Sequence, residues 1–410
     1  MGKIGLVGKT LKHSFSKDIH SYLGSYEYSL IELDEVEFDN FLLCKDFEAI
    51  NVTIPYKERV IKYLDYVSDE VNYIKACNLV INRDGKIYGY NTDAYGLERG
   101  ILAIGEVKDK VCLILGSGGT YKTASYVLKK NGAKKIYGVS RTHKDGFITY
   151  EELDSIKDEV QFIVNTTPVG MYPNVDNSPI SLDGFSSLEG LYDVVYNPLR
   201  TKLVLEARNR GVKSASGLDM LVYQAYEASK KMNRNETDEV EKIIESIRIG
   251  KENIVLIGMP SSGKSTLGKI VAKKLNRRFI DIDEEISKSI PMTIKDFILS
   301  FGEEEFRKRE SEIVKEVSKL NSCVISTGGG VIKKEDNITY LKMNGKVIFI
   351  DRELDRLTPT SSRPLSSSRD DLIKLYEERY PLYSKYSDRV VKNDDSIEKV
   401  AERIILAYED

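Results

Sequence analysis

Short apolar runs rich in β-branched residues alternate with helix-length segments along most of the chain. The runs that predict strands are 3–8, 49–54, 110–116, 134–140, 159–167, 190–196, 253–259, 278–283, 322–330 and 346–351. Strands separated by helix-length segments are typical of parallel sheets with crossover helices. The pattern therefore predicts an α/β protein.

One polar stretch, 230–253, interrupts this alternation, and its only apolar feature is a short helical stripe of Val240, Ile243, Ile244 and Ile247. A chain of 410 residues is too long for one ordinary core. We therefore place a linker here and a domain boundary near Gly250. Both resulting segments fall in the usual size range of domains.

Composition limits the functional classes. A net charge of −3 gives no reason to expect nucleic acid or an anionic membrane as a partner. No apolar run approaches the ~20 residues of a membrane span, and the start of the chain lacks the apolar core of a signal peptide. The 4 cysteines include no CxxC pair, which fits a reducing cytoplasm. We expect a cytoplasmic enzyme of small molecules; the sequence indicates no oligomeric state.

Residues 258–265, GMPSSGKS, form a glycine-rich turn between a predicted strand and a predicted helix. Backbone N–H groups of such a loop surround a nucleotide phosphate. Lys264 would bridge the β- and γ-phosphates of ATP, and Ser265 would bind Mg²⁺. The ATP-binding residues expected here are Gly258, Ser261, Ser262, Gly263, Lys264, Ser265 and Thr266.

Further motifs follow this loop: FIDID (279–283), FGEEEFRKRE (301–310), STGGG (326–330), SSRPL (361–365) and RYPLY (379–383). In this order and spacing they resemble the shikimate kinase family over nearly the whole second segment. Planar arginine forks suit a carboxylated substrate, and cations suit phosphoryl transfer.

The kinase resemblance implies a role for each motif. Asp281 would help to hold Mg²⁺, and Asp283 would activate the acceptor hydroxyl. Arg307, oriented by Glu310, and Arg379 would clamp the substrate carboxylate. The remaining implied residues are Gly328, Gly329 and Gly330 facing the substrate, Arg356 stacking on adenine, and Arg363, in a serine-rich lid, meeting the γ-phosphate.

A second glycine turn, VCLILGSGGTYKTA (111–124), occurs in the first segment, with Tyr121 where the common GxGxxG pattern has its third glycine. The next predicted strand ends without the acidic residue that binds the ribose of NAD. It ends in hydroxyl and cationic residues suited to a 2′-phosphate, which favours NADP. The cofactor residues expected here are Gly116, Gly118, Gly119, Ser140, Arg141, Thr142 and Lys144.

Residues 1 to about 248 resemble the shikimate dehydrogenase family through HSFSKDIH, INVTIPYK, KACNLV, GYNTDAYG, NTTPVGM, DVVYNPLRT and SGLDMLVYQA. Ketone reduction needs a proton donor beside the developing alkoxide; Lys57, to which Asp93 can hydrogen-bond, fits that need. The resemblance implies that Gly217 serves the cofactor, and that residues 165–171 line the nicotinamide. The substrate residues that it implies are Ser14, Ser16, Thr53, Lys57, Asn78, Asp93, Tyr196 and Gln224.

Taken together, the resemblances predict a two-domain dehydrogenase followed by a P-loop kinase with a parallel sheet. The expected layout is a substrate domain over 1–100 with C-terminal helices at about 217–248, a Rossmann domain over 101–216, and a kinase domain over 249–410. The first family reduces 3-dehydroshikimate with NADPH, and the second phosphorylates shikimate with ATP and Mg²⁺.

This combination predicts a bifunctional enzyme of the shikimate pathway of aromatic amino-acid biosynthesis. The alternative is a quinate/shikimate dehydrogenase that also uses NAD, with an inactive or regulatory kinase-like half. The Ser140–Thr142 cluster speaks against NAD. The complete sets of reacting groups, Lys57 with Asp93 and Lys264 with Asp283 and Arg363, speak against an inactive half.

Overall fold

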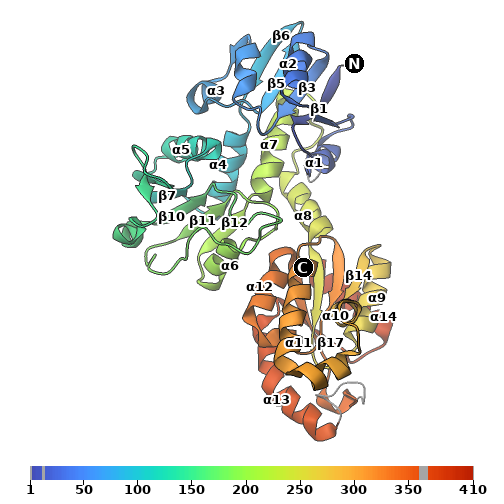
Figure 1. Ribbon diagram of the computed structural model, residues 1–410. Helices are drawn as coiled ribbons and strands as arrows, with labels where there is room; N and C mark the ends of the chain where they lie inside the picture. Colours follow the sequence, from blue (N-terminus) through green and yellow to red (C-terminus); the bar gives the residue numbers. More distant parts are fainter. Residues whose placement is uncertain (1, 12–13, 360–367, 410) are drawn as a thin grey trace. The chain divides into compact units, whose positions relative to one another are not determined.

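A computed structural model describes residues 2–11, 14–359 and 368–409. The chain divides into two compact units, Met1–Ile247 and Arg248–Asp410 (Figure 1). The first unit contains two sheets and the second contains one. The predicted α/β class is confirmed.

The first sheet has the strand order β2-β1-β3-β5-β6-β4. Its first three strands are parallel, whereas β5 runs antiparallel to both β3 and β6. The strands are β1 (Lys3–Gly8), β2 (Ser29–Glu32), β3 (Phe47–Val52), β4 (Tyr66–Val67), β5 (Leu79–Arg83) and β6 (Lys86–Tyr90). The helices of this part are α1 (Ser16–Leu23), α2 (Glu35–Cys44) and α3 (Asp69–Ile74).

The second sheet has the order β12-β11-β10-β7-β8-β9 and is parallel throughout. The strands are β7 (Val111–Leu115), β8 (Lys135–Ser140), β9 (Ile148–Thr149), β10 (Phe162–Asn165), β11 (Gly190–Asp193) and β12 (Lys213–Ser216). The helices are α4 (Asp93–Ile104), α5 (Gly119–Lys130), α6 (Lys202–Asn209), α7 (Leu218–Lys231) and α8 (Val240–Lys251).

Helices α4 and α7 pack closely because Gly96 of α4 leaves room for the backbone of α7. A Cβ at Gly96 would lie 2.4 Å from the carbonyl oxygen of Met220. The stretch expected to be a linker is largely helical: Val240, Ile243 and Ile247 of α8 are buried among residues of α1 and α7. The apolar stripe in that stretch therefore belongs to the core of the first unit.

The second unit has a parallel sheet of order β14-β15-β13-β16-β17. Its strands are β13 (Asn253–Ile257), β14 (Arg278–Asp281), β15 (Cys323–Ser326), β16 (Gly345–Asp351) and β17 (Arg389–Lys392). Its helices are α9 (Lys264–Lys274), α10 (Ile282–Ser289), α11 (Ile294–Ser318), α12 (Glu335–Asn344), α13 (Arg369–Tyr386) and α14 (Ile397–Glu409).

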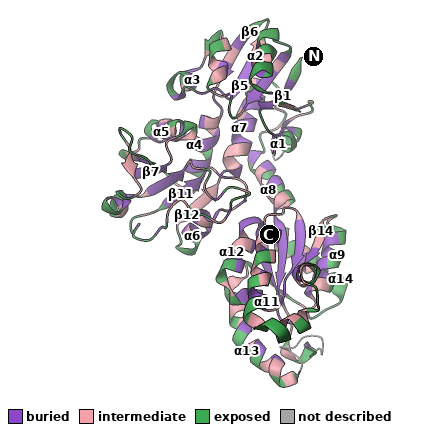
Figure 2. Cartoon of the chain, viewed as in Figure 1, coloured by how far each residue is buried: buried purple, intermediate pink, exposed green. Residues whose placement is uncertain are grey.

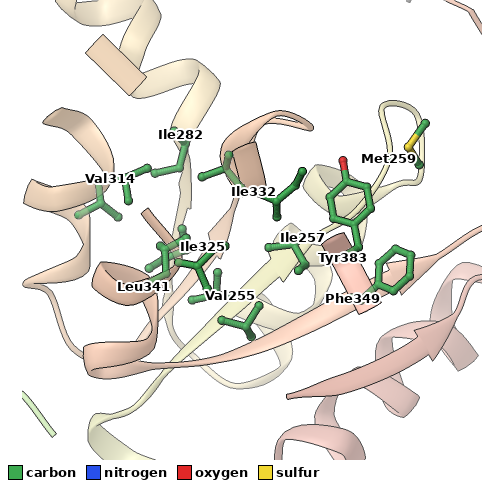
Figure 3. Close-up of a cluster of buried hydrophobic side chains, with 14 of the residues drawn as sticks. Val255, Ile257, Met259, Ile282, Val314, Ile325, Ile332, Leu341, Phe349 and Tyr383 are labelled. Atoms are coloured by element: carbon green, nitrogen blue, oxygen red, sulfur yellow. The ribbon is translucent and has the colours of Figure 1, made fainter. Parts of the chain in front are cut away.

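The central strands of the second unit are buried on both faces, as expected for a parallel sheet covered by helices (Figure 2). Figure 3 shows one face, where Val255 and Ile257 of β13 lie with Ile325 of β15 and Phe349 of β16. The carboxyl ends of parallel strands share one edge of a sheet. The loops after β13, β14, β15 and β16 therefore gather at that edge, where ligands bind in such folds.

Two candidate active sites

A cavity of about 400 Å³ in the first unit gathers side chains that the sequence analysis singled out. We call it the first-unit cavity. Thr120, the second residue of α5, and Asn51, the penultimate residue of β3, also line it. The predicted residues that line it are Ser14, Ser16, Thr53, Lys57, Asn78, Asp93, Tyr196, Gly217 and Gln224.

Lys57 and Asp93 form an ion pair in this cavity, with 2.6 Å between Nζ and Oδ2. Their side chains are 29% and 16% exposed, so water screens the pair only in part. Asp93 is the first residue of α4, where the helix dipole favours a carboxylate. The Nδ2 of Asn78 donates to Asp93 Oδ1 at 2.9 Å, and the N–H of Thr92 donates to Asn78 Oδ1 at 2.7 Å. The hydrogen bonds thus orient the amino group of Lys57 in the cavity, which suits a proton donor.

Neutral hydrogen-bonding groups complete the first-unit cavity. Ser14 Oγ donates to Ser16 Oγ at 3.1 Å at the start of α1. The ring of Tyr196 packs edge-on against Phe15, and burial raises the pKa of its hydroxyl, which therefore stays protonated. Hydroxyls and an amide such as that of Gln224 can orient the hydroxyl and carboxylate groups of a polar ring substrate without adding charge.

The glycine turn after β7 is shaped for a dinucleotide. Gly116 has φ +102°, and a Cβ there would lie 2.9 Å from Thr166 Oγ1, so only glycine fits. A Cβ at Gly118 or Gly119 would meet nothing within 4 Å, which leaves the N-terminus of α5 open to an anion. Tyr121 lies against Gly138 of β8, where a Cβ would come within 2.7 Å of its ring. Tyrosine is therefore tolerated at the position of the missing third glycine.

The predicted 2′-phosphate cluster follows β8. Ser140 Oγ accepts hydrogen bonds from Ser117 Oγ and from the N–H of Thr142, both at 3.4 Å. Lys144 Nζ donates to the carbonyl of Ser117 at 3.3 Å, while Arg141 is exposed. Cations and hydroxyls side by side fit a phosphate monoester.

A larger cavity of about 670 Å³ lies in the second unit, and we call it the second-unit cavity. Gly258, Ser262, Asp281 and Arg356 do not line it. Arg363 and most of the predicted lid fall outside the described residues. The predicted residues that line it are Ser261, Gly263, Lys264, Ser265, Thr266, Asp283, Arg307, Gly328, Gly329, Gly330 and Arg379.

In the phosphate loop, residues 258–265, the side chain of Lys264 is hydrogen-bonded to the backbone of the same loop. Lys264 Nζ donates to the carbonyls of Gly258 and Met259, each at 2.9 Å. Ser265 Oγ donates to Asp281 Oδ2 at 2.6 Å. A hydroxyl beside a carboxylate fits Mg²⁺, which takes oxygen ligands and completes its shell with phosphate and water. Over residues 2–11, 14–359 and 368–409, no group of three or more His, Cys, Asp and Glu side chains is arranged to hold a metal on its own.

The other side of the second-unit cavity carries two nearly buried arginines, Arg307 and Arg379, only 8% and 3% exposed. Arg307 Nη1 donates to Glu310 Oε2 at 2.8 Å. Burial raises the pKa of Glu310, although Arg307 opposes that shift, and its Oε1 is buried without a partner among the described residues. Nε of Arg379 is likewise without a hydrogen-bond partner there. The guanidinium donors of Arg307 and Arg379 suit the carboxylate of a bound acid.

Comparisons with known proteins match each of the two units to a different family. Residues 6–80 match the family model of the shikimate dehydrogenase substrate binding domain, and residues 260–409 match that of shikimate kinase. The NADP(+) shikimate dehydrogenase of Clostridium beijerinckii is 39% identical over 246 residues, which is 55% of this chain and 90% of that protein. The shikimate kinase of Clostridium botulinum is 44% identical over 158 residues, 38% of this chain and 95% of that protein.

The chain therefore belongs to the shikimate dehydrogenase family and to the shikimate kinase family. It is an enzyme of the shikimate pathway with both activities. A solved chorismate mutase/shikimate 5-dehydrogenase fusion protein from Clostridium acetobutylicum has a similar fold, with 34% identity and a TM-score of 0.56, and covers 60% of this chain and 97% of its own. In the described part of the chain, no helix is long and apolar enough to cross a membrane.

The sequence analysis missed several residues of the two sites. In the dehydrogenase, Asn51 accepts a hydrogen bond from Tyr28 Oη and donates one to the carbonyl of Asn78. These bonds hold Asn51 in place in the lining of the first-unit cavity. In the kinase, Tyr383 donates to the carbonyl of Gly329. Asn51 and Tyr383 both lie inside motifs quoted above. Each is a residue with a polar group in an otherwise apolar strand or helix face, and that contrast could have identified it. Arg352, which also lines the second-unit cavity, lies outside every motif.

Proposed function

We propose that the chain reduces 3-dehydroshikimate to shikimate with NADPH and then phosphorylates shikimate to shikimate 3-phosphate with ATP and Mg²⁺. One observation carries the proposal: Lys57 and Asp93 line one cavity, Lys264 and Asp283 line another, and the product of the first reaction is the substrate of the second. The NADP(+) named for the Clostridium beijerinckii relative supports the choice of cofactor.

In the reductase half, NADPH supplies the hydride when it is bound. The oxygen of the ketone then needs a proton, and Lys57 donates one from its ammonium group. Asp93 and Asn78 hold Lys57 in place. Ser14, Ser16 and Gln224 bind the carboxylate and hydroxyls of the ring, and Arg141 with its neighbours binds the 2′-phosphate of the cofactor.

In the kinase half, Asp283 takes the proton of the attacking hydroxyl, and Arg307 and Arg379 hold the carboxylate of shikimate. Lys264 and the N–H groups of the phosphate loop neutralise the charge that spreads over the transferred phosphoryl group. Ser265 and Asp281 would hold Mg²⁺, which would supply further positive charge for the transfer.

A coupled assay on the intact chain tests this function. The protein receives 3-dehydroshikimate, NADPH, Mg²⁺ and ATP, and absorbance at 340 nm and ADP release are followed separately. We expect both signals, with ADP release dependent on NADPH. NADPH consumption without ADP release, even after shikimate is added directly, would instead support a dehydrogenase with an inactive or regulatory kinase-like half. Comparing kcat/KM for NADPH and NADH tests the cofactor preference.

A further inference from the structure

Arg352 is the first residue after β16, at the carboxyl edge of the sheet in the second unit. Strand β16 is parallel to β13, and Phe349 pairs with Ile257 (Figure 3). The chain that leaves β16 therefore emerges beside the phosphate loop that follows β13. Arg352 lines the second-unit cavity together with Ser261, Gly263 and Lys264 of that loop.

The guanidinium of Arg352 makes no hydrogen bond or ion pair with the residues that the structure describes, and its Nε is buried. Leaving a buried donor without a partner costs free energy, so such groups require an explanation. The nearby Arg369, in contrast, donates to the carbonyls of Leu354 and Leu357 and to the carboxylate of Asp355. A ligand in the second-unit cavity would supply the acceptor that Arg352 lacks.

The position of Arg352 indicates which part of a ligand it meets. Gly263 is the N-cap of α9, and a Cβ there would lie 4.0 Å from Arg352 Nη1. Asn393, just after β17, donates to the carbonyl of Ser262 at 2.7 Å and so fixes the loop from the same side. Helix N-termini bind phosphate through their free N–H groups. The guanidinium therefore lies beside the point where a phosphate chain would enter.

We propose that Arg352 binds the phosphate chain of the nucleotide. This inference rests on the proposed kinase function. A guanidinium binds phosphate oxygens through parallel N–H groups, whereas the ammonium of Lys264 already donates to two carbonyls of its own loop. Arg352 adds a positive charge to the lining of the cavity, and no carboxylate of the residues that the structure describes forms an ion pair with it.

The test uses the full chain with Arg352→Gln and Arg352→Lys, and Arg278→Gln as the matched control. Arg278 is an exposed arginine at the start of β14, at the opposite edge of the sheet. We expect Arg352→Gln to raise the KM for ATP and the Kd for ADP about tenfold, because the substitution removes one charge-assisted hydrogen bond to the phosphates. The Ki of adenosine and the KM of shikimate should stay unchanged. Arg352→Lys should recover part of the loss, and Arg278→Gln should match the wild type.

Three outcomes would overturn the inference. The first is an unchanged Kd for ADP in Arg352→Gln, and the second is a Ki of adenosine that rises as much as the Kd for ADP, which would assign Arg352 to the base or ribose. The third is a rise in the KM of shikimate alone. Circular dichroism, together with an unchanged KM of shikimate, excludes misfolding of the second unit as the cause. A wild-type chain that converts no shikimate with ATP would instead contradict the proposed function, so the two failures are distinguishable.

Discussion

Tyr383 and Arg379, one turn apart on α13, both donate a hydrogen bond to the carbonyl oxygen of Gly329, at 2.5 and 3.0 Å. Tyr383 is fully buried, and its ring stacks on Phe349 with 5.2 Å between centroids (Figure 3). Burial raises the pKa of the Tyr383 hydroxyl, so it remains a donor at any physiological pH. Helix α13 therefore fixes the middle of the glycine loop, residues 328–330, whose N–H groups are proposed to face shikimate.

Removing one of these two donors should affect shikimate more than ATP. In Tyr383→Phe only Arg379 holds the carbonyl of Gly329, and a buried hydrogen bond contributes about 1 kcal/mol. We expect the KM of shikimate to rise about fivefold, while the KM of ATP stays within twofold. Steady-state kinetics with each substrate varied in turn measure this. Tyr376→Phe, on the same helix, is the control, and equal rises in both KM values would mean a general structural defect.

Gly330 gives a second prediction, because it leaves space for the clamp on the substrate carboxylate. A Cβ at this position would lie 2.2 to 2.4 Å from the guanidinium atoms of Arg307, which is impossible without moving the arginine. We expect Gly330→Ala to raise the KM of shikimate more than tenfold, because Arg307 is displaced from Glu310. Gly250→Ala is the control, since a Cβ there meets nothing within 4 Å. An unchanged KM would show that Arg307 does not bind the acid.

Lys57 tests the independence of the two active sites. Lys57→Ala removes the proposed proton donor, and general acid catalysis typically contributes ~100- to 10,000-fold. We expect the rate of NADPH oxidation to fall by at least ~100-fold, while phosphorylation of added shikimate continues at the wild-type rate. Lys264→Ala should have the reverse effect. If either change stopped both reactions in a folded protein, the two sites would not be independent.

Much of the fold follows from apolar runs, because strands buried on both faces are apolar throughout. Every run predicted as a strand contains one, but weakly apolar strands such as β2 and β12 were not predicted. The β5–β6 hairpin could have been found, since Asp84 and Gly85 have φ of 53° and 82° and Asp-Gly is a typical hairpin turn. The strand predicted over 278–283 ends at Asp281, which is the N-cap of α10, so Asp283 lies in the first turn of that helix. Aspartate is a common N-cap residue, so the sequence is compatible with a helix starting there.

Most site residues that belong to a sequence motif were predicted. Residues that reach a site only through the folding of the chain were missed. Lys57 and Asp93 are far apart in sequence, and only the motifs indicated that they belong together. Arg352 has no such signal, because a single arginine after a strand is usually a solvated charge. Its significance comes from the parallel pairing of β16 with β13, which sequence patterns do not specify.

Asp193 carries a last prediction, about stability. It is fully buried at the end of β11 and accepts from Asn165 Nδ2 at 2.9 Å and from Thr201 Oγ1 at 2.6 Å. Burial raises its pKa from 3.8 to about 6, against the effect of these hydrogen bonds. The folded state thus binds a proton more tightly than the unfolded state. This contribution to stability is fully present below pH 3.8 and is lost as the pH rises through about 6.

Asp193→Asn keeps the shape of the buried group but cannot ionise. Its oxygen can accept from Asn165, and its amide can donate to Thr201. We expect the variant to gain stability over the wild type as the pH rises from 4.5 to 7.5, by about 3 kcal/mol at most. Scanning calorimetry on the full chain measures this difference. The unfolding transition of the first unit is identified as the one whose Tm rises when NADP⁺ is added. A difference that does not change with pH would mean that Asp193 is already ionised in the folded protein at pH 4.5.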